Sequence, residues 1–132
     1  MNEDKDSFEE KITALNNTAD TTAEYDEQDI QKNKLISIFA YFGILVLIPL
    51  LGAKDSKFAR FHSNQGLILC VAAIVYYIIN AVLLSLHMVW LSMLLSLVGL
   101  VFLVWFIIGI INVVNGRAKE LPLIGHFKLL KV

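Results

Sequence analysis

Two long apolar runs separated by only two residues constrain this chain more than any other feature. Residues 66–86 and 89–114 form runs of 21 and 26 residues that contain no charged side chain. As helices they would measure about 31 and 39 Å, enough to cross a hydrocarbon core of about 30 Å. Only residues 86–90 are available to connect them. We therefore expect a tight antiparallel hairpin of membrane-spanning helices.

A third apolar run covers residues 35–51. Its 17 residues would span about 26 Å, the short end of the range for a spanning helix. Gly43 and Pro49 are consistent with a re-entrant segment, because both interrupt regular helices. We favour a span, since the run is uniformly apolar. The sequence then predicts an all-α integral membrane protein with three transmembrane helices.

Residues 1–34 differ sharply from the rest of the chain. They hold ten of the twelve acidic residues and four lysines, for a net charge of −6, whereas residues 35–132 carry +5. Such a composition cannot bury enough apolar surface to offset the entropy of ordering. We expect a mostly disordered acidic tail before a membrane domain at 35–132. One short helix is possible over residues 7–15, where Ser7 and Glu10 have capping-box spacing.

Two polar segments have the pattern of interfacial structure. Residues 54–65 place Phe58 and Phe61 among basic side chains, which suits aromatics dipping into lipid headgroups. Residues 117–132 follow Asn115-Gly116, a pair that is typical of a left-handed C-cap and predicts the end of a helix. This last segment is too short in apolar residues to span. We expect it to lie along the interface, with its lysines near the lipid phosphates.

Positive charge predicts the orientation. Seven Lys/Arg lie in the 54–65 loop and the C-terminal segment, against Lys32 and Lys34 on the opposite side of a three-span protein. The positive-inside rule places the loop and the C-terminus in the cytoplasm. With three spans the acidic tail lies outside, and with a re-entrant first run it shares the cytoplasmic side.

Polar residues near the open end of the hairpin form the candidate site. His62 precedes the turn residue His87 by 25 positions and Asn112 follows it by 25, so the two reach the same membrane level. The predicted polar cluster is Arg60, His62, Asn64, Gln65, Asn112 and Asn115. One interpretation is a set of interhelical hydrogen bonds that ties the loop to the hairpin. The other is a polar recess that works as a functional site.

Several function classes are disfavoured by the residues present. No nucleophile, base and orienting group share a motif, so we expect no enzyme and no cofactor. The lone Cys70 lies in an apolar run, where a thiol stays protonated, and no HExxH or CxxC pattern suggests a metal. Nucleic acid is excluded as a partner, because no basic stripe with interleaved aromatics lies outside the apolar runs.

Three stretches carry a family resemblance: IFAYFGILVLIPLL, FARFHSNQGLIL and NVVNGRAKELPLIGHFKLL. Over residues 35–130 they resemble a bacterial family of small membrane proteins of unknown function, similar to the Tic-type chloroplast import component. The family pattern corresponds here to Phe61, His62, Gln65 and Gly66. The resemblance implies a bundle of three or four helices, and no enzymatic role follows from it. Some relatives carry an N-terminal zinc ribbon, which this acidic tail cannot form.

These observations together predict a non-enzymatic, multi-pass protein of the bacterial cytoplasmic membrane. Its expected partners are the lipid bilayer, other membrane proteins or a second copy of itself. The alternative is a small transport or protein-translocation subunit whose polar recess contacts a passing substrate. The resemblance to an import component favours that alternative only by association.

Overall fold

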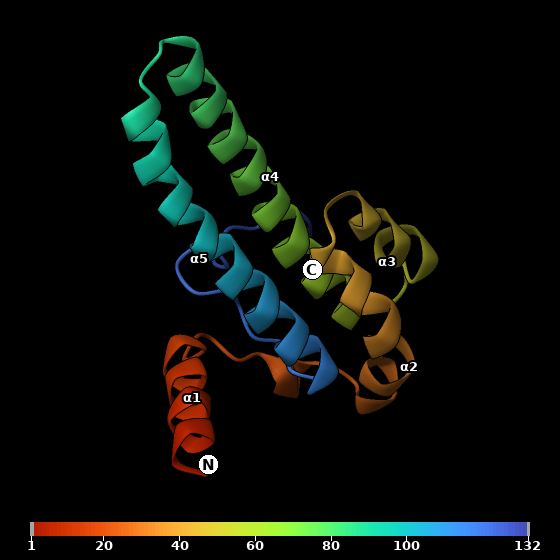
Figure 1. The fold of residues 1–132 in the computed structure, drawn as a ribbon. Coiled ribbons are helices and arrows are strands. Elements are labelled where there is room, and N and C mark those ends of the chain that lie inside the picture. Colours follow the sequence, from red (N-terminus) through yellow and green to blue (C-terminus); the bar gives the residue numbers. More distant parts are fainter. Residues whose placement is uncertain (1, 132) are drawn as a thin grey trace.

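The computed structural model describes residues 2–131, and over this range its regular elements are all helices (Figure 1). Residues 1 and 132, which end the predicted tail and C-terminal segment, lie outside the described range. The α-helices are α1 (Asn2–Leu15), α2 (Glu27–Ser37), α3 (Leu47–Gly52), α4 (Lys57–Ser85) and α5 (Val89–Val114). Short 3-10 helices are η1 (Thr22–Glu24), η2 (Ile38–Tyr41) and η3 (Gly43–Val46).

Helices α4 and α5 form the predicted antiparallel hairpin, which projects from the rest of the molecule (Figure 1). Their most apolar windows have mean hydropathies of 2.6 and 2.9, and only 11% of each window is buried. A core helix of a soluble protein would be mostly buried. These two helices are therefore long, apolar and exposed enough to cross a membrane. The turn between them includes His87, whose φ of 58° is unusual for a residue with a side chain.

The polar segment predicted to lie at the interface over residues 54–65 is not a separate element. Helix α4 begins at Lys57 and continues through the segment without a break. The Ser56 hydroxyl caps the helix by accepting a hydrogen bond from the Ala59 N–H at 3.0 Å. Because the helix is capped at its start and residues 57–65 contain no proline, the polar residues 57–65 form the first turns of the same helix as the apolar run.

A third span is not confirmed, because residues 35–51 are divided among α2, η2, η3 and α3. Gly43 has a φ of 61° and turns the chain between η2 and η3. The segment then packs against the hairpin instead of standing alone. A Cβ at Gly66 would overlap the Ala40 carbonyl, and a Cβ at Gly109 would overlap the Tyr41 ring. Both glycines thus allow η2 to approach the hairpin closely.

The disorder expected for the acidic tail is also not confirmed over its described residues. Helix α1 includes the short helix predicted at 7–15 and extends it to Asn2. Residues 16–22 then run beside the C-terminal segment: the Thr21 N–H donates to the Ala118 carbonyl at 3.0 Å and the Glu120 N–H donates to the Ala19 carbonyl at 3.2 Å. The tail is ordered by backbone partners from the other end of the chain, so it does not need an apolar core of its own.

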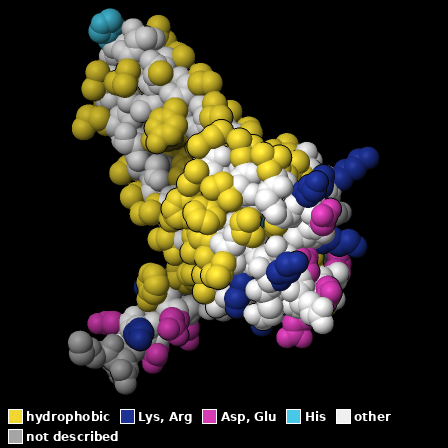
Figure 2. All heavy atoms as spheres, turned by 90° about the vertical axis from the view of Figure 1, so that its right-hand side faces the viewer, with side chains coloured by type: hydrophobic (Ala, Val, Ile, Leu, Met, Phe, Trp, Pro, Cys, Tyr) yellow, Lys and Arg dark blue, Asp and Glu magenta, His cyan; other side chains and the backbone are white. Residues whose placement is uncertain are grey.

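Buried side chains gather at the open end of the hairpin. We call residues 16–70 and 108–131 the base, and residues 71–107 the arm. The buried residues of both hydrophobic clusters lie in the base, one cluster around Tyr41 and Ile108 and the other around Phe58 and Ala118. In the arm only Ser92 is buried among the described residues. Figure 2 shows the same division, with hydrophobic side chains over the arm and charged ones around the base.

Candidate functional site

The predicted polar side chains of α4 face the C-terminal segment. Gln65 is 1% exposed and binds this segment through both atoms of its amide. Its Nε2 donates to the Gly125 carbonyl at 2.9 Å, and its Oε1 accepts from the Leu121 N–H at 2.9 Å. A buried amide with both groups paired avoids the cost of an unsatisfied polar atom. Gln65 therefore fixes a turn of backbone that contains no helix or strand.

Asn64 also binds the backbone of the C-terminal segment, a few residues beyond the part that Gln65 binds. Its Nδ2 donates to the Phe127 carbonyl at 3.0 Å. Its Oδ1 accepts from the N–H groups of Leu129 and Leu130, at 2.7 and 2.9 Å. Arg60 extends the row, because its Nε donates to the Lys131 carbonyl at 2.6 Å. Three side chains of α4 thus hold the end of the C-terminal segment against the hairpin.

His62 is fully buried and links three segments. Its Nε2 lies 2.9 Å from the Arg117 carbonyl, and its Nδ1 lies 2.8 Å from the Tyr41 hydroxyl. A carbonyl can only accept, so Nε2 carries the proton and Nδ1 accepts from the tyrosine. The ring also contacts Phe58 edge to face, with centroids 4.6 Å apart. A neutral histidine between two such partners bridges η2, α4 and the C-terminal segment.

Asn112 lies at the same level as His62 but bonds a different partner. Its amide exchanges two hydrogen bonds with Asn16, at 2.7 and 3.1 Å. The Arg117 N–H donates to the Asn112 carbonyl at 2.8 Å, so the backbone of Arg117 lies between His62 and Asn112. Asn115 is exposed just beyond α5. The predicted cluster is therefore two neighbouring groups joined through main chain, with Asn115 at the edge.

Three residues that the sequence reasoning left out complete the site. Tyr41 and Asn16 are the partners just described. Asp29 accepts from the Phe58 N–H at 3.1 Å and joins α2 to the start of α4. Burial would raise the pKa of Asp29, but hydrogen bonds from Ser56, Phe58, Asn33 and Lys57 outweigh it and lower the pKa. Of the three, only Tyr41 could have been found from the sequence, because it is one of two residues with a polar side-chain atom in the apolar run 35–51.

The hydrogen bonds of this site join side chains to partners within the molecule. Its buried side-chain polar atoms are hydrogen-bonded, and Ser63 Oγ is the only exception among the described residues. Within residues 2–131 no group of three or more His, Cys, Asp or Glu side chains is placed to hold a metal ion. The amide groups of Gln65, Asn64 and Asn112 are taken up by partners within the molecule. The arrangement is suited to holding four segments in one relative position.

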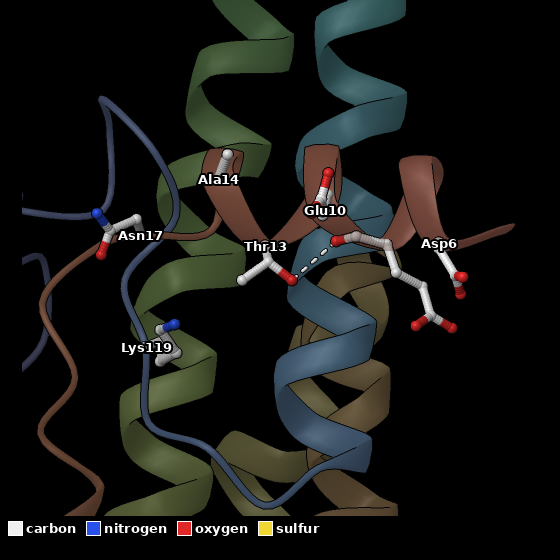
Figure 3. A pocket seen from close by; sticks show the side chains of 7 residues that line it. Asp6, Glu10, Thr13, Ala14, Asn17 and Lys119 are labelled. Atoms are coloured by element: carbon white, nitrogen blue, oxygen red, sulfur yellow. Dashed lines mark hydrogen bonds between the residues drawn. The ribbon is translucent and has the colours of Figure 1, made fainter. Parts of the chain in front are cut away.

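A second polar feature lies outside this cluster, between α1 and the C-terminal segment. An open hollow of about 620 Å³ lies between Asp6, Glu10 and other residues of 6–17 on one side and Lys119 on the other. Figure 3 shows the side chains that line it. The Thr13 hydroxyl turns back to the Glu9 carbonyl at 2.8 Å and so is bound within α1. The hollow is a solvated surface between acidic and basic side chains.

Comparison with known proteins identifies one family. The model of the magnetosome magnetite crystal formation protein family, MamF/MmsF, matches residues 32–128. The match begins inside α2 and covers the hairpin and most of the C-terminal segment. No curated protein and no solved structure matches the chain. The similarity to a Tic-type import component has no support from these comparisons, and neither has the transport alternative.

Proposed function

This chain belongs to the MamF/MmsF family of magnetosome magnetite crystal formation proteins, and from that premise we propose that it is a non-enzymatic protein of the magnetosome membrane. The α4–α5 hairpin is its anchor. Along the arm, large apolar side chains such as Tyr77, Met93 and Leu97 are more than 60% exposed. A surface of this kind is stable in hydrocarbon and unfavourable in water.

The charge distribution supports an orientation for this anchor. All eleven Lys/Arg lie outside the arm, and His87 is the only ionisable residue at the hairpin tip. With two spans, the acidic tail, the 54–56 loop and the C-terminal segment share one side of the membrane. The positive-inside rule makes that side the cytoplasm. The tip then faces the interior of the magnetosome.

This orientation carries a functional consequence. The crystal side receives only the turn at residues 86–88, whereas the base presents its charged surface to the cytoplasm. The protein therefore influences crystal formation through contacts that the base makes with other proteins of the magnetosome surface. The observation that carries this proposal is that every Asp, Glu, Lys and Arg lies outside the arm, and on the face drawn in Figure 2 the charged side chains gather away from the hairpin tip.

Thiol labelling of isolated, intact magnetosomes tests the orientation. In a Cys70→Ser background, cysteines introduced singly at Lys54 and Lys128 should react with a membrane-impermeant reagent. A cysteine at His87 should react only after the membrane is permeabilised. Reaction at position 87 in intact vesicles, with protection at 54 and 128, would reverse the proposed orientation.

Electron microscopy of crystals tests the role. In cells that lack the native gene, the base variant Gln65→Ala, which releases Leu121 and Gly125, should fail to restore crystal size and shape. The tip variant His87→Ala should restore both. Equal restoration by both variants at equal protein levels would show that the base does not carry the activity.

A further inference from the structure

An apolar groove follows the outer surface of α4 where the C-terminal segment packs against it. Its volume is about 260 Å³. All six lining side chains are apolar: Ile68, Val71 and Ala72 from α4, with Ile124, Phe127 and Leu129 from the C-terminal segment. Phe127 and Leu129 are each 54% exposed. The groove is therefore open to whatever surrounds the hairpin at this level.

Basic residues lie next to this groove, toward the N-terminal end of α4. Lys128 lies between the two lining residues Phe127 and Leu129, and Lys131 follows. Arg60 reaches the same place, because its Nε donates to the Lys131 carbonyl at 2.6 Å. Neither residues 56–65 nor residues 126–131 contain an acidic residue. The groove thus has an apolar body and a cationic end.

This end is held in place by the polar cluster. Asn64 binds the backbone of residues 127, 129 and 130 through three hydrogen bonds. The position of Lys128 relative to the groove is therefore set by α4 and not by a free chain end. A guanidinium has five N–H donors in all, so Arg60 can bind a further acceptor while it holds Lys131. The Arg60 side chain and the backbone that carries Lys128 and Lys131 are therefore held in place before any ligand arrives.

The order of these features along the hairpin matches one class of molecule. Arg60 precedes Ile68 by eight residues, or about 12 Å of helix, and residues beyond 72 continue into the exposed apolar arm. A phospholipid has the same order, with an anionic phosphate followed by an acyl chain. We propose that the groove binds an acyl chain of an anionic phospholipid, whose phosphate contacts Arg60, Lys128 and Lys131. This inference requires only that α4 lies in a bilayer and is independent of any role in crystal formation.

Native mass spectrometry of the full chain tests the proposal. The protein is released from mixed micelles with equal amounts of phosphatidylglycerol and phosphatidylcholine that carry the same acyl chains. We expect phosphatidylglycerol to dominate the bound lipid. Each cation near an anionic headgroup is worth about fivefold, so the pair Lys128→Gln and Lys131→Gln should lower this preference about 25-fold. A matched control, Lys5→Gln with Lys11→Gln on α1, removes the same charge and should leave the preference unchanged.

The apolar part of the site has its own variant. Ala72→Trp fills the groove without changing charge, and should reduce the binding of both lipids. The control Ala81→Trp places the same side chain on the exposed surface of α4 in the arm. This variant should bind both lipids as the unaltered protein does. High salt should weaken the phosphatidylglycerol preference of the unaltered protein, because exposed charges are screened.

Three outcomes would overturn the proposal. The unaltered protein could show no preference for phosphatidylglycerol. The two lysine pairs could reduce the preference equally, which would indicate a general charge effect. Finally, Ala72→Trp could leave lipid binding intact but dissociate a dimer, in which case the groove is a contact between two copies of the chain. If Ala72→Trp does not fold, the lysine pairs still decide the question.

Discussion

The base and the arm of this molecule are held together by different forces. In the base, side-chain amides and a histidine bind backbone groups of distant segments, as Gln65 does with Leu121 and Gly125. In the arm, α4 and α5 meet through side-chain packing: the rings of Tyr76 and Phe102 lie 5.2 Å apart, and the Ser92 hydroxyl donates to Asn80 Oδ1. The first kind of contact specifies a unique arrangement. The second mainly requires that two surfaces fit.

The difference follows from the surroundings of each region. Between lipid-exposed helices there is no hydrophobic driving force, because hydrocarbon is as apolar as the side chains. Association then depends on packing and on a few polar pairs. The base, in contrast, contains irregular backbone whose N–H and C=O groups must be satisfied wherever water is excluded. Polar side chains of α4 meet that requirement, so the charged and polar sequence gathers there.

The largest expected difference concerns two glycines of the hairpin. Gly66→Ala should place a Cβ into the Ala40 carbonyl, which is backbone and cannot move without displacing η2. We expect a loss of about 3 kcal/mol in unfolding free energy, at the upper end for overpacking. In the arm, a Cβ at Gly99 would lie 3.2 Å from the Tyr76 hydroxyl, the far end of a flexible side chain. Thermal unfolding in detergent should therefore show little change for Gly99→Ala. Equal effects would mean that the base is no more tightly packed than the arm.

Next in size is the buried amide pair of the base. Asn16→Ala strands the Asn112 amide, and we expect a loss of about 1 to 2 kcal/mol. Asn112→Ala should cost less in the Asn16→Ala protein than it costs alone, because Asn112 has already lost its partner there. The comparison is Asn80 with Ser92 in the arm, where hydrogen bonds between membrane helices average about 0.6 kcal/mol. Double-mutant cycles from chemical unfolding would measure both. A strictly additive cycle for Asn16 and Asn112 would contradict their pairing.

The smallest effect is a dependence on pH that belongs to the base alone. The pKa of Asp29 is lowered by its hydrogen bonds in the folded protein. The stability that Asp29 contributes to the folded protein is therefore complete above the pKa of an unfolded carboxyl, about 3.9. It is lost as the pH falls through the lower pKa that Asp29 has in the folded protein. Proteolysis of α2 at pH 7 and near pH 3, with an acid-tolerant protease, should show release only in acid. Asp29→Ala should remove most of this difference, whereas cleavage at the hairpin tip should not change.

The sequence was sufficient to predict the hairpin. Charge-free runs of 21 and 26 residues leave few alternatives to long helices, and equal spacing from His87 placed His62 and Asn112 together. It was not sufficient for residues 35–51. An apolar run that touches lipid on all sides and one that lies half-buried against a hairpin have the same composition. The structural difference here is the left-handed turn at Gly43. The φ of a glycine in an apolar run cannot be predicted from the sequence.

The tail was missed for a different reason. Its low apolar content correctly indicates that it has no core of its own. However, residues 16–22 are held by backbone hydrogen bonds and the Asn16 amide, whose partners lie about 100 residues away, and Ile30 packs in a cluster with Phe58. A backbone hydrogen bond leaves no trace in the side-chain pattern of either segment. Polar composition therefore predicted independence where the structure shows pairing.

The link between Asn16 and Asn112 also sets a sequence of events during synthesis. The tail leaves the ribosome before the residues that bind it, at 112 and 117–120, are translated. Both long helices must already be made and threaded before the tail can dock. A nascent chain whose second long helix has not been placed keeps its acidic segment loose and open to proteases. Docking of the tail therefore distinguishes finished copies of the protein from unfinished ones.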